Sequence, residues 1–203
     1  MALLAALLPA WAFGSTARDK FPTILVLGDS ISAGYGLASG EGWVALLQAR
    51  LKAQGYGYRV VNASVTGETT TGGLARLPRA LALHRPDIVI LELGGNDGLR
   101  ALPLDTSRRN LERMIEASRA AGARVLLLGM KIPPNYGPRY SAGFEQIFRD
   151  LARRHRLPFE PFFLERIALQ PGMMQADGIH PTARAQPVML DTVWPILAPM
   201  LKR

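Results

Sequence analysis

Short, largely apolar runs alternate with segments of helical periodicity along most of this 203-residue chain. Runs with little polar alternation are typical of parallel strands that are buried on both faces. Between them, apolar residues recur every three or four positions, which is the spacing of one helix face. Strands that alternate with helices predict right-handed crossovers and a parallel sheet covered by helices on both faces, in one domain. The predicted strands cover residues 23–27, 58–62, 87–93 and 124–128, with a weaker fifth strand near 157–159.

Local signals refine the predicted elements. Residues 32–42 are rich in glycine and serine and are expected to form a loop after the first strand. Pro78 is tolerated only near the first turn of the helix that contains it, because proline lacks the backbone donor that a helix interior needs. For the next helix along the chain, Asp105 and Thr106 are candidate N-caps, and Gly122 stands where that helix is expected to end.

The carboxyl ends of the strands are where parallel α/β sheets bind their ligands. Four loops of this chain are predicted to lie there, and they contain Ser30, Gly67, Asn96 and residues 132–136. The glycine-rich motifs of dinucleotide-binding and P-loop proteins are absent from the sequence, as is the G-x-S-x-G turn of α/β-hydrolases. Ser30, on the tight turn directly after the first strand, therefore remains as a candidate nucleophile that needs a base.

Three histidines compete for the role of that base. His84 lies at a helix-to-strand junction, which is the opposite edge of the sheet. His155 lies on an apolar helix face, where a lone histidine is more often a core residue. His180 lies in an irregular loop three residues after Asp177. This spacing lets the Asp177 carboxylate reach the Nδ1–H of His180, so that one segment supplies a base and its orienting group.

A serine nucleophile also needs hydrogen-bond donors for the oxyanion of the tetrahedral intermediate. No side chain shields the backbone N–H of Gly67, and the Asn96 side chain offers an amide. The backbone N–H of Ser30 is a natural third donor. Taken singly, Gly67 is a turn glycine and Asn96 an Asx-turn residue. Their joint occurrence with a serine and a histidine favours an oxyanion hole.

Four blocks of the sequence resemble those of the SGNH, or GDSL, hydrolases in their order and spacing. The blocks are residues 28–32, Gly67 within a loop of small residues, residues 94–97 and residues 177–181. The resemblance extends from about residue 21 to the C-terminus. Residues 132–137 and 185–187 are similar to a bacterial group of that superfamily that contains thioesterase I, protease I, lysophospholipase L1 and arylesterases.

The resemblance implies a flavodoxin-like, three-layer α/β/α sandwich with a parallel five-stranded sheet in the order 2-1-3-4-5. It implies Ser30 as the nucleophile, His180 as general base and then general acid, and Asp177 as the residue that orients the histidine. Asp29 and Asp97 belong to the same blocks and are interpreted as scaffolding for the turns.

The resemblance also assigns the remaining groups of the site. The N–H groups of Ser30 and Gly67 and the Asn96 amide would form the oxyanion hole. Ile132 and Tyr136 would line the acyl groove, on resemblance to the bacterial group alone. Neither a metal nor an organic cofactor is implied.

The predicted activity is that of a serine esterase that hydrolyses carboxylic esters and thioesters through an acyl-enzyme on Ser30. The substrate classes are aryl and alkyl esters, acyl-thioesters and lysophospholipids. One alternative is a carbohydrate O-acetyl esterase of the same superfamily, which would prefer two-carbon acyl groups. A second is a non-enzymatic module that binds a small ligand or a lipid, which would form no covalent adduct on Ser30.

Charge and the N-terminal segment bear on partners and location. The net charge of +8 is compatible with transient contact with an anionic lipid surface, but no nucleic-acid-binding motif is present. Residues 2–12 are apolar and uncharged, which is typical of a signal-peptide core, and Ala10-Trp11-Ala12 resembles a cleavage site. We therefore expect residues 1–17 to be a signal peptide with an N-terminal extension, and residues 18–203 to be the hydrolase domain of a periplasmic or secreted monomer.

Overall fold

A parallel sheet of five strands forms the centre of the molecule, in the order β2-β1-β3-β4-β5. The computed structural model describes residues 21–203. This strand order confirms the one that the family resemblance implies, and each predicted strand is present within two residues of its expected bounds. The strands are β1 (Thr23–Gly28), β2 (Arg59–Asn62), β3 (Ile88–Glu92), β4 (Arg124–Leu128) and β5 (Phe159–Glu160).

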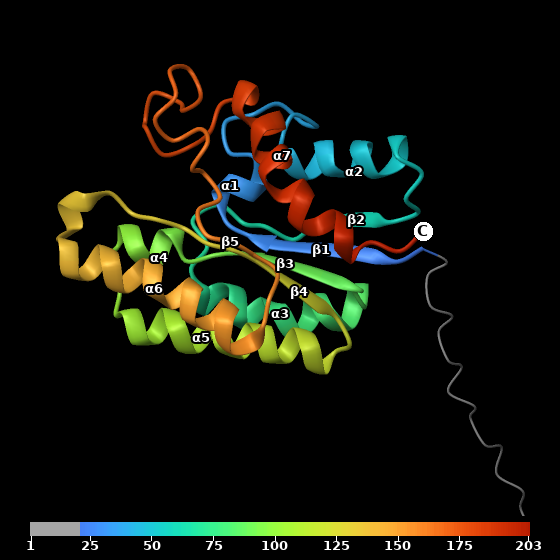
Figure 1. Cartoon of the computed structure of the whole chain (residues 1–203), viewed down its shortest axis with the longest axis horizontal. Coiled ribbons are helices and arrows are strands. Elements are labelled where there is room, and N and C mark those ends of the chain that lie inside the picture. The colour runs from blue at the N-terminus through green and yellow to red at the C-terminus, as the bar shows by residue number, and fades with distance from the viewer. Residues whose placement is uncertain (1–20) are drawn as a thin grey trace, which may run out of the picture.

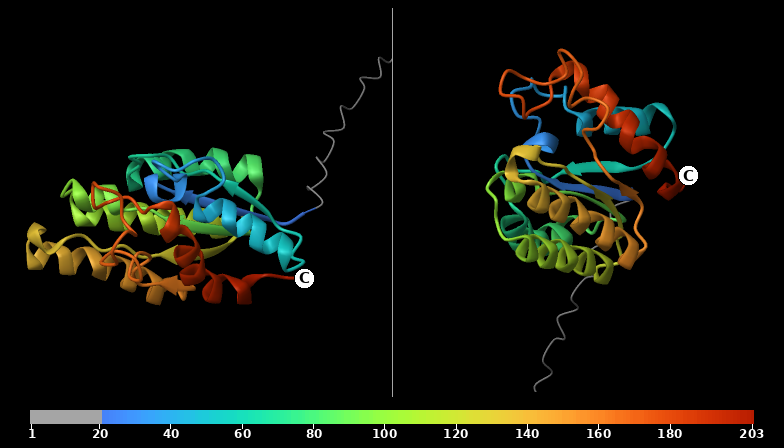
Figure 2. Two further views of the ribbon diagram at one scale, coloured as in Figure 1. Left: turned by 90° about the horizontal axis from the view of Figure 1, so that it is seen from above. Right: turned by 60° about the vertical axis from the view of Figure 1, so that its left-hand side comes forward.

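Helices cover both faces of the sheet, as Figures 1 and 2 show. The helices α2 and α7 pack on each other on one face, and α3, α5 and α6 form a contiguous layer on the other. The sandwich therefore has the three layers that were predicted. The helices are α1 (Ser30–Ala33), α2 (Trp43–Ala53), α3 (Thr70–His84), α4 (Gly95–Leu99), α5 (Leu104–Ala120), α6 (Pro138–His155) and α7 (Gln186–Leu197), with short 3-10 turns at Pro134–Tyr136, Ala183–Ala185 and Ala198–Met200.

The position of β1 and β3 in the interior of the sheet explains why their sequences do not alternate between apolar and polar residues. Every residue of β1 and of β3 is buried, because each strand has a neighbour on both sides and helices on both faces. Helix α5 contributes the matching stripe on one face through Leu111, Met114 and Ile115. Burial of each such side chain stabilises the fold by about 1.5–3 kcal/mol.

Helix α3 begins earlier than its proline suggests. It starts at Thr70, so that Pro78 lies in its middle and not near its first turn. The buried Asp97 carboxylate fixes this start, because it accepts hydrogen bonds from Thr70 N at 2.8 Å and from Thr70 Oγ1 at 2.6 Å. Two bonds to a charged group contribute about 1.5–3 kcal/mol each, which offsets the roughly 3 kcal/mol cost of an interior proline.

The predicted N-caps of α5 are wrong, whereas its predicted end is confirmed. Pro103 is the N-cap, and its carbonyl accepts the first bonds of the helix, from Thr106 N at 3.0 Å and Ser107 N at 3.4 Å. Asp105 and Thr106 therefore lie within the first turn, where the acidic side chain of Asp105 still interacts favourably with the helix dipole. Gly122 follows the end of the helix with a φ of +87°.

The signal-peptide prediction for residues 1–17 falls outside the described residues. Within residues 21–203, the helices are not long and apolar enough to cross a bilayer. Figure 1 shows that the described chain starts and ends on the side of the molecule away from α1.

Candidate active site

Ser30 lies at the carboxyl end of β1, as the first residue of the four-residue helix α1. The Asp29 side chain caps this helix by accepting a hydrogen bond from Ile31 N at 3.0 Å. Residue 28 must be small, because a Cβ there would lie 2.5 Å from Glu92 Oε2 and 2.8 Å from Ser32 Cβ. The turn therefore places Ser30 at the carboxyl edge of the sheet, and the Asp29 side chain fixes the backbone of the turn. Residues 32–33 belong to this helix and not to the loop that was predicted for them.

His180 reaches Ser30 from the far end of the chain. Its Nε2 lies 3.0 Å from Ser30 Oγ, across 150 residues of sequence, and its Nδ1 lies 2.6 Å from Asp177 Oδ2. When Nδ1 carries the proton and donates it to the carboxylate, Nε2 is the acceptor for the serine hydroxyl. The Tyr35 ring packs against the imidazole with 4.4 Å between ring centroids. The side chains of Ser30, His180 and Asp177 thus form a hydrogen-bonded series.

Asp177 is held in its position by its own loop. Its Oδ1 accepts hydrogen bonds from Ile179 N at 2.9 Å and from His180 N at 3.0 Å. The bond from the His180 side chain, followed by these backbone bonds, lowers the pKa of Asp177 to about 2. The carboxylate is therefore ionised at any pH above that range, and it stabilises a proton on the imidazole.

Asn96 comes to the same edge on α4, a short helix where only a loop was expected after β3. Its Nδ2 donates a hydrogen bond to Asp29 Oδ2 at 3.2 Å, which leaves the second amide hydrogen for a ligand. The neighbouring Asp97 accepts hydrogen bonds from Thr70 and from Ser107 Oγ, so it serves as scaffolding between α3 and α5. Asp29 likewise caps α1 and holds Asn96.

Gly67 approaches from the loop after β2. This loop is attached to the serine turn, because Val65 N donates to Gly28 O at 3.1 Å, and to α4, because Arg100 Nη2 donates to Gly67 O at 3.2 Å. Gly67 has a φ of +77°, a conformation that favours glycine. Within residues 21–203, no protein group accepts a hydrogen bond from the N–H of Gly67 or of Ser30. Both donors are free for a ligand.

A buried network beneath the serine turn was missed by the sequence analysis. Glu92 is fully buried at the end of β3, and its Oε2 accepts hydrogen bonds from Ser32 Oγ at 2.6 Å and Asp29 N at 3.4 Å. Trp43 Nε1 donates to Ser32 Oγ at 3.1 Å. A carboxyl group at the end of an otherwise apolar strand is a signal that could have identified Glu92 as a buried polar anchor.

The pKa values of these buried carboxyl groups are shifted in the opposite direction to that of Asp177, whose pKa is lowered by hydrogen bonds. Burial, and then the negative charge of Asp29, raises the pKa of Glu92 well above its ordinary value of 4.5. Burial also raises the pKa of Asp29 to about 6, although the hydrogen bonds from Ile31 N and Asn96 oppose the shift. The buried pair beneath the turn thus holds protons that free carboxyl groups would lose.

Ile132 and Tyr136 both lie against α4. Ile132 is buried, and its Cγ2 occupies the space that a side chain on Gly98 would need. Tyr136 is half-buried and donates its hydroxyl hydrogen to Leu99 O at 2.8 Å. Both residues therefore support the helix that carries Asn96.

The other two histidines lie away from Ser30. His84 ends α3 on the opposite edge of the sheet, as expected. His155 is mostly buried, and its Nε2 lies 3.2 Å from Glu112 Oε1. Glu112, Glu116 and His155 form the one cluster within residues 21–203 that could hold a metal ion. Glu112 is already paired with Arg154 at 2.7 Å.

A serine, a histidine and an aspartate in hydrogen-bonded series at the carboxyl edge of a parallel sheet are the arrangement of a serine hydrolase. The comparison with known families specifies which kind. Residues 26–186 match the model of the GDSL-like lipase/acylhydrolase family. The chain belongs to this family and is a carboxylic ester hydrolase.

Individual relatives cover nearly the whole chain. It is 55% identical to "Esterase TesA" of Pseudomonas aeruginosa over 186 residues, which are 92% of each protein. It is 42% identical to "Thioesterase 1/protease 1/lysophospholipase L1" of Escherichia coli K12 over 189 residues, 93% of this chain and 88% of that protein. The crystal structure of TesA superposes with a TM-score of 0.86 at 55% identity, over 88% of this chain and 99% of that one.

Proposed function

We propose that this enzyme is a serine esterase that hydrolyses carboxylic esters and thioesters through an acyl-enzyme on Ser30. The observation that carries the proposal is the continuous series from Ser30 Oγ to His180 Nε2, at 3.0 Å, and from His180 Nδ1 to Asp177 Oδ2, at 2.6 Å. The first separation lets a proton pass from the nucleophile to its base, and the second lets the Asp177 carboxylate orient that base.

The first half of the reaction acylates the serine. Ser30 Oγ attacks the acyl carbonyl carbon while its proton passes to His180 Nε2. The resulting imidazolium is stabilised by the ionised Asp177. Collapse of the tetrahedral intermediate breaks the bond to the alcohol or thiol, which leaves with the proton from Nε2. In the second half, His180 Nε2 takes a proton from water while the water oxygen attacks the acyl carbonyl carbon. Collapse of this second intermediate breaks the bond to Ser30 Oγ and releases the acid, and Ser30 Oγ takes the proton back from His180 Nε2.

The oxyanion of each tetrahedral intermediate is proposed to bind the N–H groups of Ser30 and Gly67 and the free amide hydrogen of Asn96. The two unpartnered backbone donors support this role, because buried or half-buried N–H groups are otherwise almost always paired. The bond from Asn96 to Asp29 fixes the amide in place before substrate binds. Each donor of this kind contributes about 3–4 kcal/mol of transition-state stabilisation.

The direct test is the Ser30→Ala variant with a p-nitrophenyl ester as substrate. We expect its turnover to fall by at least a thousandfold, and a fluorophosphonate to label the parent protein, but not the variant, with one equivalent on residue 30. Ser39→Ala removes a hydroxyl from an exposed serine in the loop after α1 and is the matched control. Turnover by Ser30→Ala at the parent rate would contradict the proposal.

The acyl specificity is proposed from the relatives and from the residues near α4. The names esterase and thioesterase/lysophospholipase among the relatives favour aryl and alkyl esters, acyl-thioesters and lysophospholipids as substrates. Ile132 and Tyr136 are proposed to border the acyl chain, because both pack on the helix that presents Asn96. A series of esters and thioesters from two to sixteen carbons tests this proposal. Activity restricted to acetyl esters would instead indicate a carbohydrate O-acetyl esterase.

Location and assembly form the last part of the proposal. We infer that residues 1–17 direct export to the periplasm or beyond, on the basis of their apolar, uncharged composition. N-terminal sequencing of exported protein tests this, since cleavage after Ala12 predicts Phe13 as the new terminus. We also infer a monomer, on the resemblance to the small hydrolases of the same superfamily. Sedimentation velocity provides the check.

A further inference from the structure

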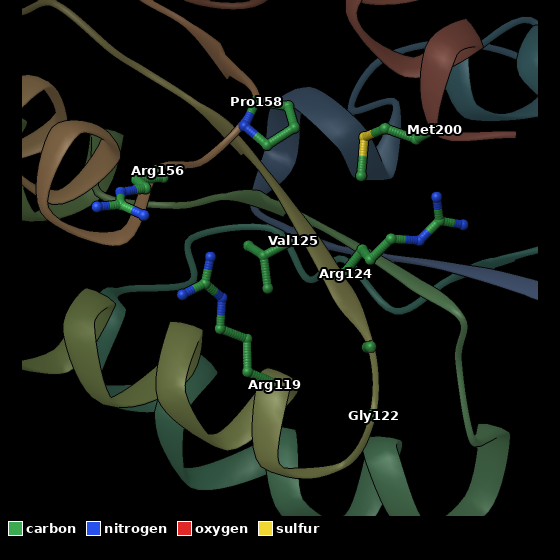
Figure 3. A pocket seen from close by; sticks show the side chains of 8 residues that line it. Arg119, Gly122, Arg124, Val125, Arg156, Pro158 and Met200 are labelled. Carbon is green, nitrogen blue, oxygen red and sulfur yellow. The ribbon is translucent and has the colours of Figure 1, made fainter.

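A hollow opens at the edge of the sheet opposite Ser30. It lies at the amino ends of β4 and β5 and has a volume of about 380 Å³, which suits a small ligand. Figure 3 shows it from close by. Three arginines and several apolar side chains border it, together with the loop between α5 and β4. We call it the arginine pocket, and its lining residues are Arg119, Gly122, Ala123, Arg124, Val125, Arg156, Pro158 and Met200.

The positive charge of the pocket is not neutralised by the protein. Arg119 donates one hydrogen bond to the carbonyl of His155, and its other N–H groups remain available. Within residues 21–203, no carboxylate pairs with Arg119, Arg124 or Arg156. The adjacent arginines on α6 are different, because Arg153 pairs with Asp150 and Arg154 pairs with Glu112.

The arrangement of two of these side chains indicates what would neutralise them. Figure 3 shows the guanidinium groups of Arg119 and Arg156 on the same side of β4, at the ends of α5 and α6, whereas Arg124 extends away from them. The bond to the His155 carbonyl holds Arg119 in place. Two guanidinium groups that face one space repel each other, so an anion between them stabilises both.

The number of donors favours phosphate over carboxylate. Each guanidinium offers a fork of parallel N–H groups, and a single fork already satisfies the two oxygens of a carboxylate. A phosphate monoester has three terminal oxygens and about two negative charges at neutral pH, so it can engage both forks. Pro158 also lines the pocket and is only partly buried, so its ring offers an apolar surface to the organic part of the same ligand.

We propose that the arginine pocket binds a phosphate monoester, with Arg119 and Arg156 holding the phosphate and Pro158 contacting its organic group. The phosphate can belong to a soluble metabolite or to a lipid headgroup. The pocket contains none of the residues of the esterase site, so the proposal stands apart from the esterase mechanism.

The test uses the full chain and two probes. Glycerol 3-phosphate is titrated calorimetrically at low ionic strength, and vesicles of phosphatidylcholine with and without phosphatidic acid are used in a flotation assay. The pocket variant carries Arg119→Gln with Arg156→Gln. The control variant carries Arg79→Gln with Arg109→Gln, two exposed arginines on α3 and α5 that give the same net charge. Both variants are expected to hydrolyse a p-nitrophenyl ester at the parent rate, which confirms that they fold.

The two probes distinguish the source of the phosphate. Saturable binding of glycerol 3-phosphate that weakens at least tenfold in the pocket variant, and not in the control, indicates a soluble ligand. Phosphatidic-acid-dependent flotation that is lost only in the pocket variant indicates a lipid headgroup. If the pocket variant does not fold, Arg156→Gln alone is expected to weaken binding severalfold. Equal behaviour of pocket and control variants with both probes, or no binding by the parent protein, would overturn the proposal.

Discussion

The buried carboxyl group of Glu92 makes the stability of this protein depend on pH, and a single substitution can measure its contribution. Glu92 Oε2 accepts hydrogen bonds from Ser32 and from the backbone of Asp29, and within the described chain its Oε1 has no partner. Burial and the nearby Asp29 carboxyl raise the pKa of Glu92 well above 4.5. Between 4.5 and that raised pKa, the folded protein holds a proton at Glu92 that the unfolded chain has lost.

The sign of the effect follows from proton linkage. A group whose pKa is higher in the folded state contributes its full stabilisation below the unfolded pKa and loses it as pH rises through the folded pKa. The loss amounts to on the order of 1 kcal/mol for each pH unit in that window. Asp29, with a pKa raised from 3.8 to about 6, acts in the same direction over its own window. The parent protein should therefore lose stability as the pH rises from 5 to 7.

The Glu92→Gln variant removes this titration and keeps the shape and the acceptor oxygen of the side chain. Because the variant retains Asp29, the contribution of that group largely cancels when the two proteins are compared. We expect the unfolding free energy of the variant, relative to the parent, to increase by roughly 2 kcal/mol between pH 5 and pH 7. Urea unfolding followed by far-ultraviolet circular dichroism at pH 5, 6 and 7 measures the difference. A difference that stays constant over this range would refute the assignment of a raised pKa to Glu92.

Three further substitutions, the last with a control variant, test the site and the packing of the fold. Asn96→Ala should lower kcat by about 10²–10³-fold with little change in KM, because its amide acts on the oxyanion and not on the bound ester. Asp177→Asn should lower kcat by about 10²–10⁴-fold, because a neutral amide cannot stabilise the imidazolium. The native side chain does so throughout the working range, since its pKa of about 2 keeps it ionised. Steady-state kinetics measures the effects of Asn96→Ala and Asp177→Asn. Gly129→Ala should lower the unfolding free energy by about 1–3 kcal/mol in urea titrations, because the new Cβ collides with the carbonyl oxygen of Pro161; Gly57→Ala, where the nearest atom would be 3.7 Å away, should change it little.

The sheet could be predicted from sequence because its central strands are buried on both faces. A strand such as β1 is apolar at most positions because both of its faces are buried. The helices between the strands cross over with one hand, so the carboxyl ends of the strands meet at one edge. The loops that bear Ser30, Gly67 and Asn96 are placed on that edge by topology alone. Family resemblance supplied the strand order, which residue patterns do not contain.

Features that depend on tertiary contacts were not predictable in the same way. The start of α3 is set by Asp97, 27 residues further along, and this contact outweighs the local signal of Pro78. Ser32 donates a hydrogen bond to Glu92 although the two residues are 60 positions apart in the sequence. The residues around Glu92 therefore do not indicate which side chain it contacts. The packing of Tyr35 on His180 is equally invisible, because neither residue's neighbours in sequence specify the other.

The separation of 150 residues between Ser30 and His180 also has a consequence for the chain during its synthesis. The strand that presents Ser30 leaves the ribosome about 150 residues ahead of His180 and its loop. Until that loop emerges, a nascent chain carries its serine without the base that would activate it. Ester bonds in the surroundings are exposed to a working enzyme only after the segment with Asp177 and His180 has emerged and packed against the carboxyl end of the first strand.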